Sequence, residues 1–168
     1  CQSNGIGASK TGSAVITDCI PNLHLHDTGQ CFPLYYYKEK VVGTVSGKSH
    51  TEWVRHDAIT DAALSAFRKT YAASRSADGK AGADIGKEDL FYYVYGILHS
   101  PEYKKRFESD LKKQLPRIPY ARDFWAFSTA GRELAHWHLN YETVEPHPLT
   151  QGGELDLGDP ALYRVQKM

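Results

Sequence analysis

The sequence predicts an α+β fold, in which a small N-terminal β-rich part precedes a helical layer of about four helices and an extended tail. Three zones of composition support this order. Residues 1–50 contain short runs of β-branched and aromatic residues interrupted by glycine and proline, a pattern typical of strands and turns. Apolar residues recur at helical spacing across residues 51–141, whereas residues 142–168 have no clear period. We therefore expect a single domain over residues 1–168.

Three or four short strands are expected before about Val45. One of them contains the segment YYYKEK, and the alternation of side chains along a strand would place Tyr36, Lys38 and Lys40 on one face. Such a face suits contact with a nucleic-acid strand. It suits an ordinary edge strand with solvated lysines equally well. The pattern alone leaves both interpretations open.

The first two predicted helices cover about residues 60–72 and 87–99. Thr60 can cap the first of them, because its hydroxyl can accept a hydrogen bond from a free amide of the first turn. Small and polar residues, including two glycines, fill residues 73–84, which indicates a loop between these helices.

Ser100 and Pro101 give a clear start signal for a third helix, which should run to about Leu115. The motif PRIP then ends it, because proline cannot continue the hydrogen-bond ladder of a helix. A fourth helix is expected over about residues 123–138, and the chain should be extended after Tyr141. The apolar stripes of the last three helices should bury one set of side chains together: Tyr93, Ile97, Phe107, Leu111, Phe124, Phe127 and Leu134.

Composition excludes several classes of protein. With 41% hydrophobic and 24% charged residues the chain is close to an average soluble domain, and its apolar runs fall far short of the roughly 18 residues that span a bilayer. Twenty basic residues balance twenty acidic ones, so contact with nucleic acid must depend on local patches. Three cysteines, an odd number, argue against a disulfide framework and for a reducing, cytoplasmic compartment.

The first residue, Cys1, leaves two origins of the chain open. The chain is either a fragment of a longer polypeptide or a mature bacterial lipoprotein that carries lipid on Cys1. The apolar stretch AVITDCI, which begins at Ala14, favours the fragment, because a lipoprotein would normally have a loose polar tether there.

The sequence offers little metal or catalytic chemistry. Cys19, His24, His26 and Cys31 have atoms that can bind zinc, but their spacing is not that of a zinc knuckle, because neither cysteine has a close cysteine partner. We therefore expect no metal site. The sequence also lacks a nucleophile elbow, an HExxH motif and a supported pair of carboxylates, so we expect no catalytic residue in this chain.

The middle of the chain carries a long motif, DLFYYVYGILHSPEYKKRFESDLKKQLPRIPYARDFWAFSTAGRELAHWHLNYE, from Asp89 to Glu142. This motif closely resembles the C-terminal specificity region of type ISP restriction-modification enzymes. The segments GIGASK, VITDCIPNLHLH and GQCFPLYYY are similar to the front of the same region, so the resemblance covers the chain from Cys1 to about Pro148. The loop over residues 73–86 is longer than expected for the family, which suggests a local insertion.

The resemblance implies a large polypeptide that carries a nuclease, an ATPase motor, an adenine-N6 methyltransferase and, last, a target recognition domain. This chain is similar to that last part. The implied function is sequence-specific DNA recognition, which would direct adenine-N6 methylation and ATP-driven translocation and cleavage by the upstream domains. The implied partners are double-stranded DNA and the upstream methyltransferase domain, without a membrane. S-adenosylmethionine, ATP and Mg would be cofactors of the parent protein, and none is expected in this chain.

Five residues are expected to include the DNA contacts: Lys10, Gln30, Lys38, Arg117 and Arg122. Lys10 ends a glycine-rich loop that can approach a DNA backbone, and Lys38 is likewise a candidate for phosphate contact. Gln30, Arg117 and Arg122 are candidate base readers, since glutamine can pair with adenine and arginine with guanine. Arg117 could instead anchor the junction after the third helix. A lipid-anchored envelope protein and a non-catalytic protein-interaction domain stay open as alternative functions.

Overall fold

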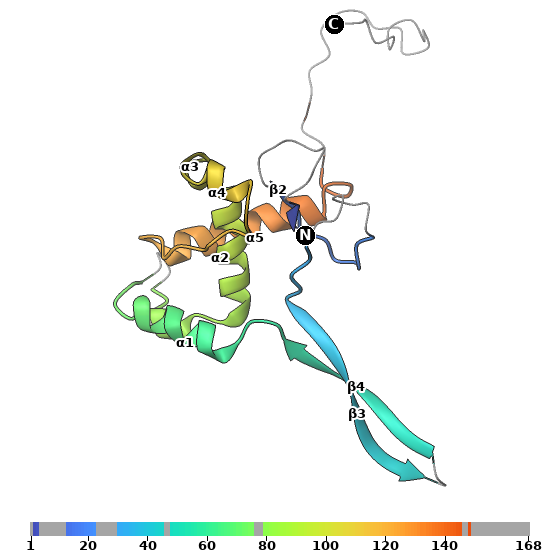
Figure 1. Cartoon of the computed structure of the whole chain (residues 1–168). Coiled ribbons are helices and arrows are strands. Elements are labelled where there is room, and N and C mark those ends of the chain that lie inside the picture. Colours follow the sequence, from blue (N-terminus) through green and yellow to red (C-terminus); the bar gives the residue numbers. More distant parts are fainter. Residues whose placement is uncertain are drawn as a thin grey trace, which may run out of the picture.

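The computed structural model describes residues 2–3, 13–22, 30–45, 48–75, 79–145 and 148 of the chain. They form a helical body from which a long antiparallel hairpin projects (Figure 1). A short pairing of β1 (Gln2–Ser3) with β2 (Ser13–Ala14) lies beside the body. The predicted α+β class is therefore confirmed. Among the described helices, none is long and apolar enough to cross a membrane.

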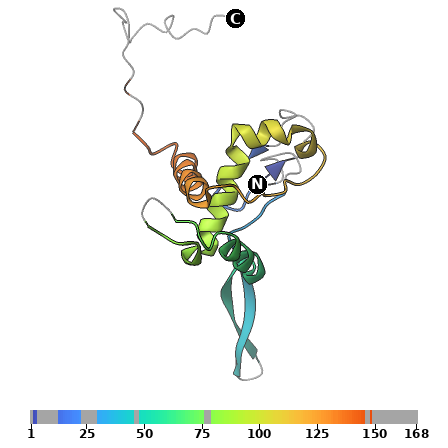
Figure 2. The same cartoon turned by 90° about the vertical axis from the view of Figure 1, so that its left-hand side faces the viewer.

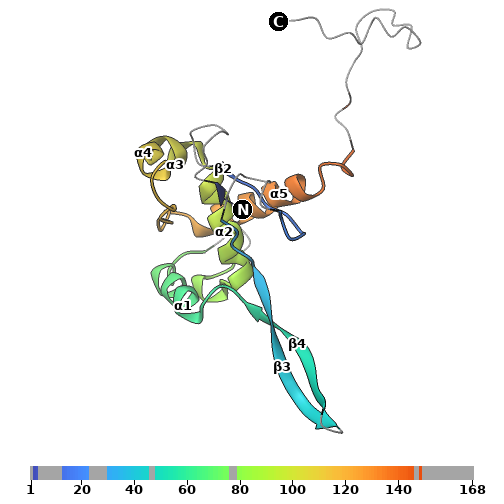
Figure 3. The same cartoon turned by 45° about the vertical axis from the view of Figure 1, so that its right-hand side comes forward.

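The hairpin consists of β3 (Tyr35–Val45) and β4 (Lys48–Asp57), which pair from Tyr35 opposite Asp57 to Val45 opposite Lys48. The register shifts between Val41 and Gly43, so Val42 is an extra residue of the kind that forms a β-bulge and strengthens the twist of a ribbon. Figures 2 and 3 show the hairpin reaching away from the helices. Among the described residues, the ribbon thus contacts the body at its base alone.

The expected boundary between strands and helices near residue 50 was wrong, because β4 continues to Asp57. The segment KSHTEWVRHD is polar and charged on both of its faces. A strand that is solvated on both faces lacks the apolar alternation by which strands are found in a sequence. The helical part therefore begins only after the hairpin.

The helices of the body start where local signals predicted them. α1 (Asp61–Thr70) is capped by Thr60, whose hydroxyl accepts a hydrogen bond from the Ala63 amide at 3.2 Å. A 3-10 turn, η1 (Gly82–Asp84), precedes α2 (Lys87–His99). α3 (Pro101–Arg106) is capped by Ser100, α4 spans Glu108–Leu111, and α5 (Phe124–Leu139) is capped by Asp123.

The third helix was predicted to run without a break to about Leu115, and this was wrong. Phe107 leaves the helical conformation, with φ −111° and ψ 19°, and separates α3 from α4, which ends at Leu111. Tyr103 before the break and Leu111 after it are both buried in the same core. Tertiary packing therefore overrides the local helical pattern at this point.

The core lies between α1, α2, α5 and the segment that joins α4 to α5. Of the seven side chains predicted to be buried, Tyr93, Ile97, Leu111 and Phe124 are buried, and the other three are half-buried. The ring of Tyr93 stacks on Phe124 with centroids 4.8 Å apart. The predicted core is therefore confirmed for six of the seven side chains, whereas Leu134 is half-buried outside this cluster.

α2 and α5 cross in direct backbone contact (Figure 1). This contact is made possible by two glycines. A Cβ atom on Gly131 would lie 2.0 Å from the carbonyl oxygen of Tyr92, and one on Gly96 would lie 2.4 Å from that of Phe127. Any side chain at either position would push the two helices apart.

Three tyrosine hydroxyls fasten the irregular segment 112–123 to the helices. Tyr71 donates to the Ala121 carbonyl at 2.6 Å, Tyr93 to Pro119 at 2.6 Å, and Tyr103 to Arg117 at 2.8 Å. The Tyr93 hydroxyl also accepts a hydrogen bond from the Ala121 amide at 2.7 Å. These bonds satisfy backbone groups that have no helix or sheet partner, and they fix the path of the segment.

Candidate functional site

One face of the hairpin is basic, and we define this basic face as Tyr36, Lys38, Lys40, Gly43, His50, Glu52, Val54 and His56. The register places Tyr36 opposite His56, Lys38 opposite Val54 and Lys40 opposite Glu52. The predicted grouping of Tyr36, Lys38 and Lys40 on one face agrees with this register. Within the described residues Lys38 and Lys40 form no ion pair, so their charges are available to a ligand.

Aromatic rings support the basic face near the base of the hairpin. Tyr36 stacks on His56 with ring centroids 5.4 Å apart, and the Lys38 ammonium lies 5.3 Å from the Tyr36 ring centroid. The ring thus attracts the cation and limits the directions that its side chain samples. The basic face thus presents the Lys38 ammonium next to a pair of stacked rings.

The opposite face of the ribbon, which we call the aromatic face, consists of Tyr35, Tyr37, Glu39, Val41, Thr51, Trp53, Arg55 and Asp57. The Arg55 guanidinium lies 4.4 Å from the Tyr35 ring centroid. Tyr37, Val41 and Trp53 are 59%, 62% and 66% exposed. Large apolar side chains therefore face away from the chain's own core.

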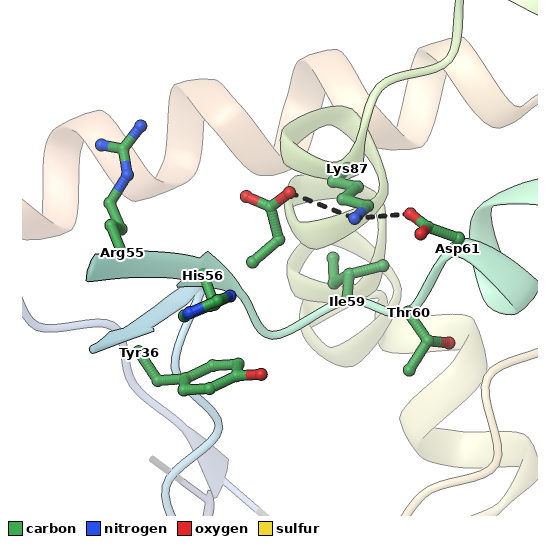
Figure 4. A pocket seen from close by; sticks show the side chains of 8 residues that line it. Tyr36, Arg55, His56, Ile59, Thr60, Asp61 and Lys87 are labelled. Atoms are coloured by element: carbon green, nitrogen blue, oxygen red, sulfur yellow. Dashed lines mark hydrogen bonds and ion pairs between the residues drawn. The ribbon is translucent and has the colours of Figure 1, made fainter. Parts of the chain in front are cut away.

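A polar pocket marks the place where the hairpin joins the body (Figure 4). There the Lys87 ammonium lies 3.1 Å from Asp57 at the end of β4 and 2.7 Å from Asp61 at the start of α1. The hydrogen bonds to Asp61 and Asp57 raise the pKa of Lys87, and Lys87 lowers the pKa of Asp61. A lysine in the first turn of a helix is unfavourable to the helix dipole, so these two partners account for its position. Lys87 thereby links the hairpin to both α1 and α2.

The residues predicted to contact DNA lie on different elements. Gln30 precedes the hairpin and is exposed, and Lys38 lies on the basic face. Arg117 and Arg122 lie on the segment 112–123, where both are exposed. Lys10 lies outside the described residues.

Arg117 does not act as the anchor that its position between two prolines suggested. Its backbone carbonyl accepts the hydrogen bond from Tyr103, while its guanidinium has no hydrogen-bond or ion-pair partner in the part of the chain that the structure describes. Anchoring is therefore a property of the main chain, and the side chain is available for contact with a ligand.

The sequence reasoning missed the contribution of β4. His50, Trp53, Arg55 and His56 all lie on this strand, which was assigned to the helical part. The only available signal was the short group of residues typical of strands, Thr51, Trp53 and Val54.

A second polar cluster lies where β2 packs on α2. The His99 ring lies 4.6 Å from Tyr95 and 5.4 Å from His138, centroid to centroid, and the Tyr95 hydroxyl is 2.6 Å from His138 Nδ1. Burial, with the charges of Lys104 and His138, lowers the pKa of His99 to about 4. Burial raises the pKa of Tyr95 to about 12. Both groups are therefore neutral at pH 7.

The four candidate zinc ligands are only partly covered by the described residues. Cys19 and Cys31 are free and exposed, whereas His24 and His26 lie outside the described residues. The ranges that are described contain no group of three or more His, Cys, Asp or Glu side chains that could hold a metal ion. The expectation of no metal site stays a prediction.

Comparison with known proteins identifies the class to which this fold belongs. A family model for the Type ISP C-terminal specificity domain matches residues 1–168, and the chain belongs to this family. No curated protein matches it significantly.

Two solved structures are similar to the chain. One, described as "cryoEM structure DrdV-DNA complex", is 34% identical, with 94% of this chain covered and a TM-score of 0.67. The other, the ATP-dependent Type ISP restriction-modification enzyme LlaBIII bound to DNA, is 29% identical, with 84% covered and a TM-score of 0.59. This chain spans 14% of the first protein chain and 8% of the second.

Proposed function

We propose that this chain is the sequence-specific DNA recognition module of a Type ISP restriction-modification enzyme. Its family and the two DNA-bound structures support this proposal. The observation in this chain that carries it is the projecting ribbon with its basic face. The whole-chain family match favours this function over the lipid-anchored envelope protein.

The dimensions of the ribbon suit duplex DNA. Ten paired residues at about 3.3 Å each give a ribbon roughly 33 Å long, and the major groove of B-DNA is wide enough to admit two strands. The net charge of the chain is zero, so attraction to phosphates must come from a local surface. Lys38 and Lys40, which form no ion pair with any described residue, supply positive charge at that surface.

The remaining candidates divide by their chemistry. Lys10 would join Lys38 on the phosphates, while Gln30, Arg117 and Arg122 would read base edges. Catalysis would belong to the upstream domains, which would methylate adenine with S-adenosylmethionine and use ATP and Mg for translocation and cleavage. The partners would then be double-stranded DNA and the methyltransferase domain, in the cytoplasm.

The test is alanine substitution in the full-length enzyme, with DNA binding and methylation measured on cognate and single-mismatch duplexes at two salt concentrations. Lys38→Ala and Lys40→Ala should each weaken binding to all sequences and lower the salt slope by about one. Lys112→Ala is a matched control, because the Lys112 ammonium is already paired with Glu108 at 2.6 Å.

The candidate base readers have a different signature. Alanine at Gln30, Arg117 or Arg122 should cost about 1 to 3 kcal/mol on the cognate duplex and relax specificity at one base pair. Retention of parental affinity and discrimination by all of these variants, including those at Lys38 and Lys40, would contradict the proposed surface.

A further inference from the structure

The aromatic face of the hairpin is a continuous patch on a ribbon that nothing else in the described chain covers. Trp53 lies opposite Glu39, so Tyr37 and Val41 are its diagonal neighbours on the other strand. Diagonal pairs on one face are within reach of aromatic side chains. All three are more than half exposed. They therefore form one patch rather than scattered apolar residues.

Such a ribbon needs a partner for physical reasons. A two-stranded hairpin is marginally stable in water unless a further strand or a helix packs on it. No described helix packs along β3 or β4, and Figures 1 and 3 show the hairpin extending away from the helices. Exposed tryptophan, tyrosine and arginine on one face are typical of residues that dominate protein interfaces.

Charge indicates that this partner is not the DNA. On the aromatic face the charge of Arg55 is balanced by that of Glu39, and Asp57 is paired with Lys87, so this face has no excess positive charge to attract phosphates. The lysines lie on the opposite face, and side chains on a strand alternate between faces. When the basic face contacts a duplex, the aromatic face must point away from it.

We propose that the aromatic face docks on an apolar protein surface with a basic rim, located in the upstream part of the same polypeptide. This inference rests on the proposed function, which makes the chain one part of a larger enzyme. The two similar structures belong to chains of which this one spans 14% and 8%, so most of such a polypeptide lies outside it. Covalent linkage holds that surface at high effective concentration, which favours it over a second copy of the enzyme. The basic rim would pair with Glu39.

The test is photocrosslinking of the full-length enzyme with p-benzoylphenylalanine placed singly at Trp53, Tyr37 or Lys40, with the crosslinked peptides mapped by mass spectrometry. The probes at Trp53 and Tyr37 should link to upstream peptides of the same polypeptide, with or without DNA and independently of enzyme concentration. The probe at Lys40 is the matched control on the opposite face, and it should link to cognate DNA.

Three outcomes would overturn the docking proposal: links from the Trp53 and Tyr37 probes to DNA, links only to a second copy, or no protein link from either position. The use of two probe positions guards against the misfolding of one variant. The proposed function fails separately. If the Lys40 probe does not link to DNA while the Trp53 probe still links to upstream peptides, the docking proposal is supported and the proposal that the basic face contacts DNA is contradicted.

Discussion

Replacement of Gly131 by alanine tests whether α2 and α5 are in backbone contact. The added Cβ would lie 2.0 Å from the Tyr92 carbonyl oxygen and 2.8 Å from the Gly96 amide nitrogen. The first distance is more than 1 Å short of the 3.4 Å at which ordinary contact begins. Since both neighbours are main-chain atoms of a packed helix, rotamer changes cannot relieve the overlap, and the helices must move apart.

The expected magnitude follows from two opposing effects. Overpacking of a core typically costs about 1 to 3 kcal/mol, and this site lies at the upper end because the overlap is with backbone. Alanine recovers about 1 kcal/mol of helix propensity over glycine. The free energy of unfolding of Gly131→Ala should therefore fall by about 2 kcal/mol, measured by urea denaturation of the chain.

Two controls separate packing from propensity. Ala130→Gly, at an exposed position of α5, should lose about 1 kcal/mol from propensity alone. Gly43→Ala, where a Cβ would meet open space, should change stability by less than about 0.5 kcal/mol. If Gly131→Ala instead stabilises the protein by about 1 kcal/mol, the two helices do not touch at this position and the packing argument is refuted.

Four further predictions concern other parts of the chain. Leu111→Ala should lower the free energy of unfolding by about 2 to 5 kcal/mol in urea, because it empties a buried site, and a loss below 1 kcal/mol would contradict that burial. The free energy of unfolding should fall as the pH drops from about 6.5 toward 4, because His99 stays neutral in the folded state while the unfolded chain binds a proton there. In His99→Gln the melting temperature should depend less on pH across this range. An unchanged pH dependence of the melting temperature would exclude His99 as the cause. Lys87→Met should accelerate hydrogen exchange at the base of β4 with less than about 1 kcal/mol of global destabilisation, whereas Lys112→Met should leave the hairpin unaffected. Elemental analysis of protein purified without a histidine tag should find no stoichiometric zinc, and one equivalent per chain would restore the cysteine and histidine set as a site.

The helix starts could be predicted from the sequence because their causes are local. Thr60 and Ser100 each accept a hydrogen bond from an amide three residues later, so the signal and the structure involve the same few residues. The break at Phe107 has no such local cause. It depends on Tyr103 and Leu111 reaching a common core, which a reading of one helix cannot show.

The candidate site was predictable to a similar extent. Alternation along one strand was enough to group Lys38 with Tyr36 and Lys40. The partner strand β4 was missed, because the polar residues on both of its faces hide the alternation typical of a strand. The stacking of His56 on Tyr36 and the aromatic face around Trp53 were missed for the same reason. Pairing between strands is a non-local property, so the second half of the surface appears only once the register is known.

The segment 112–123 is held to the helices through its main chain, so its side chains are not needed for this attachment. Tyr71, Tyr93 and Tyr103 bind its main-chain carbonyls, which every amino acid possesses. Arg117 and Arg122 can therefore be exchanged for other residues while the path of the segment is kept. If Arg117 and Arg122 read bases, as proposed above, a recognition module built in this way could acquire a new target sequence by single substitutions, without first having to evolve a new scaffold.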